Sequence, residues 1–457
     1  CRYQRYLEES KKQDVFLQIC NHNYLLADAY HRAEGYKPLL ADYRTLIVDE
    51  AHKLPEAARQ MFGKNLCMDD IREMAYYLER EHQKEETRIL RTVVGDALRV
   101  VGTEQRIGKG IRETFQNTTN SVVSLWEGVE MLEFLLEKLE RSVPMWIRNR
   151  LEEAKDVLEC FCSSDEKYVR YLRLDTEQIP VLCAASREIP GLLRKMLWDR
   201  EEGVSAILTS GTLKAGTGFL RTRQTTGLEE RTGVQEYVAE SPFSYEKNCL
   251  LYLPKTLEHC RRGSREEAVM VANHIHSLIC STYGHTLVLF TSYTLMGSVY
   301  QILRDSLPFP MVEVWRHSQE EILRFKTMEN AVLFAAGSCW EGVDFPGDMV
   351  SSLIIVKLPF VVPDPISEAE KETYESLEDY IQAIIVPDMQ KKLRQGFGRA
   401  IRTETDTCVV SILDFRAVKG GKYHEDVMCA LPPCPIAEEL GEVQDFIRSR
   451  KGVEYYL

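Results

Sequence analysis

The spacing of hydrophobic residues changes twice along the chain, and each change predicts a different kind of structure. Residues 44–48, Arg-Thr-Leu-Ile-Val, form a short β-branched run that predicts a buried strand. From about Met68 to Cys162, apolar residues recur at helical intervals, which predicts a helical insertion. From Val204 onward, short apolar runs alternate with stretches of helical spacing, which predicts a parallel sheet with helices on both faces. The strands expected there are residues 206–208, 250–253, 286–290, 331–335, 353–356 and 408–413, and residues 265–282 are an expected helix.

Composition narrows the class of protein. A length of 457 residues with 44% hydrophobic composition predicts about two to four domains. The longest apolar runs, such as residues 353–356, are too short to span a membrane, so no membrane association is expected. Thirteen cysteines without the dense spacing of a secreted disulfide scaffold indicate a reducing compartment, and we expect a cytoplasmic location. The net charge of -13 argues against a protein that coats nucleic acid, although it leaves room for a narrow basic channel.

An acidic tetrad, Asp49-Glu50-Ala51-His52, follows the first predicted strand. Ligands of open α/β sheets lie at the carboxyl ends of strands. Phosphoryl transfer needs a carboxylate that holds Mg²⁺ and a group that positions or deprotonates the attacking water, and Asp49 and Glu50 could supply both. His52 would then be free to sense the nucleotide. The alternative is a chance acidic turn at a strand end.

A second element, Gln395-Gly396-Phe397-Gly398-Arg399-Ala400-Ile401-Arg402, contains two arginines three positions apart. We expect Arg399 and Arg402 to share one helical face, where they could stabilise the charge of a transferring phosphoryl group. A surface helix with two solvated cations is the alternative. Gly396 and Gly398 argue against it, because a glycine inside a helix costs about 1 kcal/mol and needs a packing reason.

Three further polar clusters each follow a predicted strand. Their residues are Thr209-Ser210-Gly211-Thr212, Thr291-Ser292-Tyr293 and Trp340-Glu341-Gly342-Val343-Asp344. Hydroxyl groups and exposed backbone at the carboxyl end of a strand can contact phosphates. Each cluster taken alone could also be an ordinary loop.

Taken in order, the five elements resemble the motifs of superfamily-two helicases. Residues 241–246 (Ser-Pro-Phe-Ser-Tyr-Glu), residues 340–347 and Leu358-Pro359-Phe360 are similar to the DinG branch of the XPD-like DNA helicases. The resemblance covers nearly the whole chain and is weakest in the helical insertion. It implies an α/β fold with two RecA-like parallel-sheet lobes, the first incomplete, and an all-helical arch insertion. The implied division is residues 1–66 and 163–230 for the first lobe, 67–162 for the arch and 231–457 for the second lobe.

The resemblance also implies an activity and a role for each matched residue. The implied activity is movement along single-stranded or forked DNA from five-prime to three-prime, driven by ATP and Mg²⁺, by a monomeric enzyme. Asp49 would coordinate Mg²⁺, Glu50 would activate water, and His52 would belong to the same catalytic site. Gln395 would order the site, and Arg399 and Arg402 would be arginine fingers. Glu341, Gly342 and Asp344 would help to bind ATP, and Thr209, Ser210, Thr212, Thr291 and Ser292 would couple hydrolysis to the grip on DNA.

The sequence departs from this family in two places. No Gly-x-x-x-x-Gly-Lys-Ser/Thr loop is present, because no hydroxyl residue follows Gly63-Lys64 or Gly108-Lys109. We therefore expect this polypeptide to hydrolyse ATP poorly alone and to be the C-terminal portion of a longer helicase. Cys1 resembles the last ligand of the family's iron-sulfur (4Fe-4S) cluster, but such a cluster needs four protein ligands, and Cys160 and Cys162 lie in the wrong region.

Two other functions are compatible with the sequence. The first is a shortened homologue that binds single-stranded DNA or a partner without turnover. The presence of Asp49, Glu50, Arg399 and Arg402 together argues against it, because a protein without hydrolysis has no chemical need for them. The second is a nuclease, for which the sequence has no convincing carboxylate cluster apart from Asp49 and Glu50.

Overall fold

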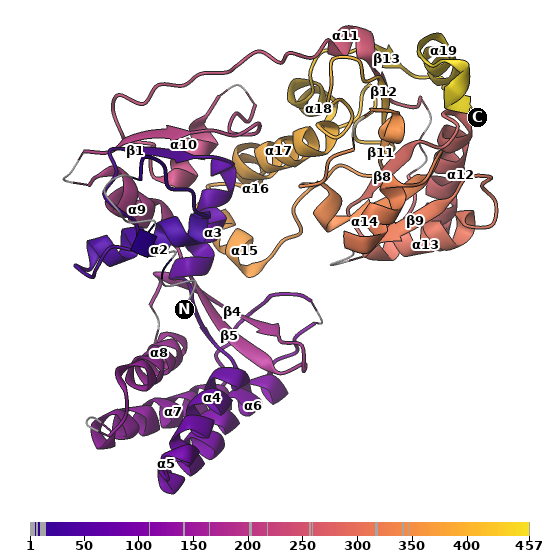
Figure 1. Ribbon diagram of the computed structural model, residues 1–457. Helices are drawn as coiled ribbons and strands as arrows, with labels where there is room; N and C mark the ends of the chain where they lie inside the picture. Colours follow the sequence, from indigo (N-terminus) through magenta and orange to yellow (C-terminus); the bar gives the residue numbers. More distant parts are fainter. Residues whose placement is uncertain are drawn as a thin grey trace. The chain divides into compact units, whose positions relative to one another are not determined.

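The computed structural model divides into two compact units (Figure 1). Unit 1 consists of Cys1–Ser210, Thr222–Val234 and Val362–Tyr380, and unit 2 of Gly211–Arg221, Gln235–Val361 and Ile381–Leu457. The structure describes residues 5, 8–9, 15–108, 110–139, 142–163, 165–200, 203–216, 218–255, 257, 259–315, 319–340, 342–345 and 347–456. Among these, no helix is long and apolar enough to cross a membrane.

Unit 1 contains a parallel pair of strands that carries the acidic tetrad. Strand β1 (Thr45–Val48) pairs with β6 (Ser205–Leu208), so that Val48 lies opposite Leu208. Helix α2 (His22–Ala33) precedes β1, and the short helix η1 (Ala51–Lys53) and α3 (Leu54–Phe62) follow it. The prediction that β1 is buried is correct only at Val48, since Ile47 is 61% exposed. The reason is that the described residues form only a two-stranded sheet here, which leaves part of its surface uncovered.

A second sheet in unit 1 is antiparallel and four-stranded, in the order β2-β5-β4-β3. Its strands are β2 (Lys64–Leu66), β3 (Glu113–Thr114), β4 (Tyr168–Leu174) and β5 (Pro180–Ser186). The insertion is therefore helical over most of its length but contains the short strand β3. The hairpin of β4 and β5 was not predicted, because β5 is buried along nearly its whole length and shows no alternation of polar and apolar residues.

Helices pack on this antiparallel sheet and form the core of that part of unit 1. They are α4 (Met68–Arg80), α5 (Lys84–Ile89), η2 (Leu90–Val94), α6 (Gly95–Glu104), α7 (Thr119–Lys138) and α8 (Met145–Cys162). Their buried faces enclose Leu78, Leu98, Leu132 and Leu158 together with Leu182 of β5. Burial of these apolar faces is what stabilises helices of this length.

The rest of unit 1 consists of short helices around the two sheets. They are α9 (Ile189–Leu193), η3 (Arg194–Trp198), α10 (Leu220–Thr226, whose first two residues group with unit 2), α15 (Pro365–Lys371) and α16 (Leu377–Tyr380). The segment with α15 comes from a distant part of the chain and is attached by side chains. Arg112 Nη1 lies 3.0 Å from Asp364 Oδ2, and Arg187 Nη1 donates to Ala369 O at 3.1 Å.

Unit 2 is built on a seven-stranded parallel sheet in the order β13-β7-β12-β11-β8-β10-β9. The strands are β7 (Cys249–Tyr252), β8 (Thr286–Phe290), β9 (Met311–Val314), β10 (Val332–Ala336), β11 (Ser352–Ile355), β12 (Cys408–Ile412) and β13 (Ile436–Ala437). Five of them match predicted runs to within one residue at each end, and neighbouring strands of this sheet are parallel throughout the described residues. This confirms the predicted parallel α/β fold class.

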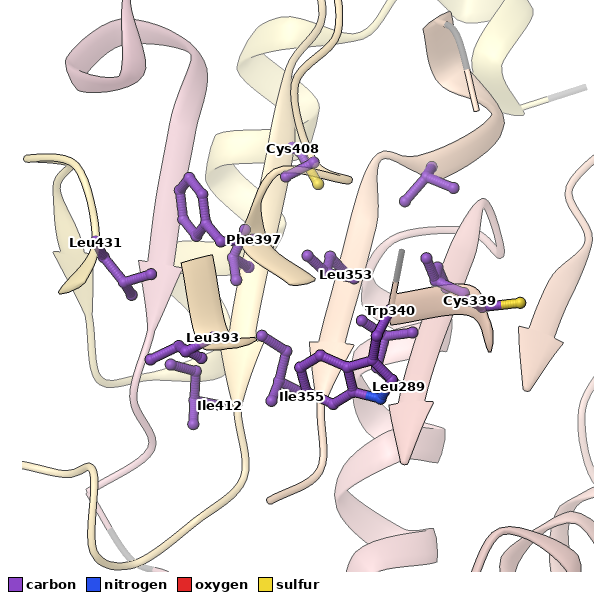
Figure 2. Close-up of a cluster of buried hydrophobic side chains, with 14 of the residues drawn as sticks. Leu289, Cys339, Trp340, Leu353, Ile355, Leu393, Phe397, Cys408, Ile412 and Leu431 are labelled. Carbon is purple, nitrogen blue, oxygen red and sulfur yellow. The ribbon is translucent and has the colours of Figure 1, made fainter. Parts of the chain in front are cut away.

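Helices cover both faces of this sheet. Helices α12 (Arg265–Ser281), α13 (Tyr293–Leu303) and α19 (Leu440–Arg450) pack on one face, and α14 (Gln319–Lys326), α17 (Val386–Phe397) and α18 (His424–Ala430) pack on the other. Shorter helices are α11 (Tyr245–Asn248), η4 (Gly337–Trp340), η5 (Gly347–Val350), η6 (Ile381–Ile385) and η7 (Val453–Tyr456). Successive residues of β8 enter opposite cores, and Figure 2 shows Leu289 beside Trp340 and Ile355 in the core under α17.

Candidate active site

The acidic tetrad and the Thr-Ser-Gly-Thr segment meet at the carboxyl ends of β1 and β6. The backbone pairing of the two strands continues beyond them, because Thr209 N donates to Val48 O at 2.9 Å and Ala51 N donates to Thr209 O at 3.0 Å. Glu50 has φ of 46°, in the left-handed region that a residue with a side chain rarely adopts. Such a conformation is found where surrounding contacts hold it, often at functional sites.

Ser210 joins the carboxylate of Glu50 to the imidazole of His52. The Ser210 hydroxyl donates to Glu50 Oε2 at 3.0 Å, and His52 Nδ1 lies 2.8 Å from Ser210 Oγ and 3.2 Å from Glu50 Oε2. Because the serine proton points to the carboxylate, we assign the imidazole proton to Nδ1, which donates to the serine oxygen. The His52 side chain is 7% exposed and that of Glu50 is 56% exposed. The carboxylate is thus held on one side and open to solvent on the other.

Asp49 lies beside this network on an exposed turn. Its Oδ1 accepts the Glu50 N–H at 2.9 Å, and its backbone oxygen bonds His22 Nε2 at 2.8 Å. Mg²⁺ is usually bound by one or two carboxylates together with substrate phosphates and water, so an exposed carboxylate at this position fits the ion. Within the described ranges, no group of three or more His, Cys, Asp or Glu residues that could hold a metal by itself is present.

The segment Gln395–Arg402 is not one continuous helix, which corrects the prediction that its two arginines share a helical face. Helix α17 ends at Phe397, with Gly398 as its C-cap, so Gln395 lies within the helix and both arginines follow it. The chain turns after Arg402, where the Asp406 carboxylate accepts the backbone N–H groups of Arg402 at 2.8 Å and of Thr403 at 2.9 Å. These groups would otherwise continue the helical pattern of hydrogen bonds.

Both arginines nevertheless lie against the segment 340–344. Arg399 donates through Nε to Trp340 O at 3.4 Å and through Nη1 to Val343 O. Arg402 Nε is buried without a hydrogen-bond partner and lies 2.9 Å from Asp344 Oδ1, close enough for an ion pair but without hydrogen-bond geometry. Unit 2 therefore brings together two motifs whose contacting residues are 56 to 59 positions apart in the sequence.

Trp340 anchors this segment. Its ring is buried under α17, and its Nε1 donates to Phe290 O at 3.0 Å. Gly396 lies where a Cβ would approach the ring to 2.7 Å, so glycine is needed for this contact, as the sequence predicted. Gly342 has φ of 76° on the exposed turn that follows. Glu341 lies outside the described residues.

The remaining predicted site residues occupy separate positions. Ser292 is the N-cap of α13 and accepts Leu295 N at 3.4 Å, and exposed Thr291 precedes it at the end of β8. Thr212 is buried and groups with unit 2, whereas Thr209 and Ser210 group with unit 1. Cys1 lies outside the described residues. The described cysteines form no three-ligand group, so they do not fit an iron-sulfur cluster, and we assign no step to one.

Sequence reasoning missed two polar residues of α17, Gln390 and Arg394, which bind the segment that follows Ser210. Gln390, which is 3% exposed, accepts Gly216 N at 3.1 Å and donates to Asp426 O at 2.9 Å. Arg394 donates to Lys214 O at 2.7 Å and to Ala430 O at 3.0 Å, and burial lowers the pKa of its guanidinium. The only available signal was their spacing of four positions, which places both side chains on one face of α17.

Comparisons with known proteins agree with this fold. The Helicase C-terminal domain family matches residues 275–434. The ATP-dependent DNA helicase YoaA of Haemophilus influenzae is 28% identical, over 97% of this chain and 71% of that protein. The ATP-dependent DNA helicase DinG of Photobacterium profundum is 33% identical, over 57% of this chain and 38% of that protein. The solved structure of S. tokodaii Xpd4 matches with a TM-score of 0.58 and 17% identity, over 91% of this chain and 81% of that one.

These findings show the fold of the chain and the proteins that it resembles. The structural match shows that the chain has the α/β fold of XPD-type helicases with RecA-like parallel sheets. The matches in sequence confirm the resemblance inferred from the motifs, and the chain is similar to the helicases YoaA and DinG.

Proposed function

We propose that the chain is the motor part of an ATP-dependent DNA helicase that moves along single-stranded or forked DNA from five-prime to three-prime. The observation that carries the proposal is the Ser210 hydroxyl, which joins Glu50 to His52 at the carboxyl ends of two parallel strands. The names of the relatives, which are ATP-dependent DNA helicases, support the same reaction. We further propose that the protein acts as a monomer in the cytoplasm.

In this proposal Glu50 positions and deprotonates the attacking water. The donors of Ser210 and His52 both approach Oε2 of Glu50, which fixes the direction of the carboxylate. A fixed carboxylate saves the reorganisation that a mobile one would need in the transition state. Bound through Asp49, Mg²⁺ would supply charge neutralisation for the phosphate oxygens. A carboxylate that is open to solvent on one side can accept the proton of a water molecule that arrives there.

Arg399 and Arg402 have the chemistry to stabilise negative charge on a transferring phosphoryl group. In the structure they are engaged with the carbonyl groups of Trp340 and Val343 and with Asp344. We propose that phosphate oxygens replace these acceptors during turnover. Gln395 would orient the site from the last turn of α17, and residues 340–344 would follow the arginines as they move. Thr291 and Ser292 would contact the DNA backbone.

The test replaces Glu50 by glutamine, which keeps the shape of the side chain and removes its basicity. We expect ATP binding to remain and DNA-stimulated ATP hydrolysis to fall by about two to four orders of magnitude, the range for a positioned general base. Glu56→Gln is the matched control, because Glu56 lies on α3 and accepts hydrogen bonds from its helix neighbours Arg59 and Gln60. Unchanged hydrolysis in Glu50→Gln would refute the assigned role.

Two further measurements test the finer parts of the proposal. Duplexes with a single-stranded tail at either the five-prime or the three-prime end distinguish the direction of movement, and only the five-prime tail should allow unwinding. The 457 residues contain no Gly-x-x-x-x-Gly-Lys-Ser/Thr motif, so we propose that they hydrolyse ATP slowly by themselves. The assays therefore use the natural gene product alongside these residues alone. Equal rates for the two would contradict this part of the proposal.

A further inference from the structure

Three cysteines line up across one edge of the unit 2 sheet. Cys408 of β12 lies directly opposite Cys249 of β7. On the other side of β7, β13 pairs Ile436 with Leu251, and the pairing continues toward the N-terminus because Leu251 N donates to Pro435 O at 2.8 Å. Extending the same register by two residues places Cys434 beside Cys249.

The three side chains point to the same face of the sheet. Residues in register on parallel strands share a face, and Cys249 and Cys408 are both buried in the core under α17 and α18, with Cys434 packed against its edge. Cys434 is partly exposed, whereas Cys249 and Cys408 are 0% exposed. The row therefore runs from a solvent-accessible thiol to two buried ones.

Cys434, at the partly exposed end of this row, and its buried neighbour Cys249 differ in acidity. A hydrogen bond between their sulfurs lowers the pKa of Cys434, against the opposing effect of its partial burial. The same hydrogen bond, together with burial, raises the pKa of Cys249 well above its usual value. The Cys249 thiol therefore donates to the Cys434 sulfur, and Cys434 is the more acidic thiol of the pair. Burial raises the pKa of Cys408 to about 12, which keeps that thiol protonated.

The direction of its pKa shift distinguishes Cys434 from several other cysteines of the described residues. Partial burial raises the pKa of Cys20 and of Cys280, which solvent can reach, and raises that of Cys162 to about 11. Reaction with peroxides requires a thiolate that solvent can reach, and a neighbouring thiol then closes the disulfide. Exposure alone would favour Cys20, Cys280 or Cys429 as the reactive thiol, whereas the strand register favours Cys434, because it places the Cys249 thiol beside it.

We propose that Cys434 and Cys249 are a peroxide-reactive pair that closes into a disulfide bridging β13 and β7. Neighbouring strands lie about 4.7–4.9 Å apart, which falls within the range of about 4.4–6.8 Å between the Cα atoms of disulfide-bonded cysteines. Because residues in register share a face, the two sulfurs can approach without a change of strand register.

The reaction balances with hydrogen peroxide as the oxidant. The Cys434 thiolate attacks one peroxide oxygen, the O–O bond breaks, and the hydroxide that leaves takes up a proton to become water. The resulting Cys434 sulfenic acid is attacked by the Cys249 sulfur, an S–S bond forms, and the departing hydroxide takes the Cys249 thiol proton as a second water. Two thiols lose two electrons in total, and one peroxide molecule is reduced to two waters.

The pair is close to residues of the candidate site but does not depend on the proposed function. Asn248, next to Cys249, donates to Glu404 O at 2.8 Å in the turn that follows Arg402. The modification is read out chemically on the folded chain, so its outcome is independent of ATP hydrolysis.

The test exposes the reduced, folded chain to a small molar excess of hydrogen peroxide at pH 7. The remaining thiols are alkylated after denaturation, and the peptides are mapped by mass spectrometry. We expect a peptide pair linked through Cys249 and Cys434 that dithiothreitol separates, with Cys280 still alkylated at the same dose. Cys434→Ser should abolish the link and leave Cys249 alkylated. Cys429→Ser, which removes an exposed cysteine near Cys434 in sequence, should retain the link.

Other patterns would overturn the proposal. One is full alkylation of Cys249 and Cys434 at a peroxide dose that oxidises Cys280. Another is a disulfide that joins Cys434 to Cys429 and not to Cys249. A second variant, Cys249→Ala, changes the partner cysteine. Alanine is used at position 249, because a buried serine hydroxyl could disturb folding. Its circular dichroism spectrum is compared with that of the unchanged chain. In folded Cys249→Ala, Cys434 should be trapped as a sulfenic acid by a dimedone probe, and failure to trap it would also count against the pair.

Discussion

Replacing Gly396 by alanine tests whether the contact between α17 and Trp340 holds residues 340–344 in place. A Cβ at Gly396 would lie 2.7 Å from Cζ3 and 2.8 Å from Cε3 of the indole. Either the ring or the helix has to move. The ring is buried, and its Nε1 is held by Phe290 O at 3.0 Å, so it has little freedom to give way.

Two effects of the added methyl group oppose each other. Alanine is favoured over glycine inside a helix by about 1 kcal/mol, whereas adding a carbon to a packed core costs about 1–3 kcal/mol. The added carbon meets a ring that is fixed at its opposite edge, so we expect the upper part of that range and a net loss of about 1–2 kcal/mol. That corresponds to about a 5- to 30-fold fall in the ratio of folded to unfolded molecules.

Urea unfolding followed by circular dichroism measures this loss. Gly441→Ala is the matched control, because Gly441 lies in α19 of the same unit and has no atom within 4 Å of the position of an added Cβ. We expect a lower midpoint for Gly396→Ala and no fall for Gly441→Ala. ATP hydrolysis by the natural protein should fall as well, since Arg399 bonds the Trp340 carbonyl. A midpoint for Gly396→Ala at or above that of the unchanged protein would refute the reasoning.

Two further predictions concern Ser210 and Asp414. Ser210→Ala removes a hydrogen bond to a carboxylate, typically about 1.5–3 kcal/mol. Because the Glu50 side chain is 56% exposed, water compensates for part of the lost hydrogen bond. We expect kcat to fall about fivefold, which corresponds to a rise of about 1 kcal/mol in the activation free energy. The KM for ATP should stay nearly constant, and a change confined to KM would contradict the role. Asp414 is buried, which alone raises its pKa, but bonds from Arg416 and the Leu358 N–H outweigh burial and lower it. Its stabilisation is therefore complete above the unfolded pKa of about 4 and lost as pH falls through the lower folded value. Asp414→Asn should lower the free energy of unfolding at pH 7 and differ less from the unchanged protein below about pH 4, and a pH-independent difference in urea titrations would argue against this linkage.

The sequence predicted the central strands of unit 2 well. Strand β8 and its neighbours β10 and β11 are covered by helices on both faces, so each is a continuous apolar run that a sequence displays directly. The antiparallel hairpin of β4 and β5 was not predicted. Strand β5 is also a continuous buried run, but a short apolar run that follows a helical region cannot be distinguished from a buried helix segment by periodicity alone.

In the candidate site, motif order by itself indicated which residue types matter and which family they resemble. The sequence thereby determined the α/β class, the acidic tetrad and the arginine-rich segment. Only the tertiary structure decided that Ser210 reaches Glu50, that Arg399 and Arg402 lie beyond the end of α17, and that Gln390 binds Gly216. The physical reason is that hydrophobic periodicity reports which side of a local element is buried. Hydrogen bonds between residues more than a hundred positions apart depend on strand pairing and chain reversal, which leave no periodic trace in the sequence.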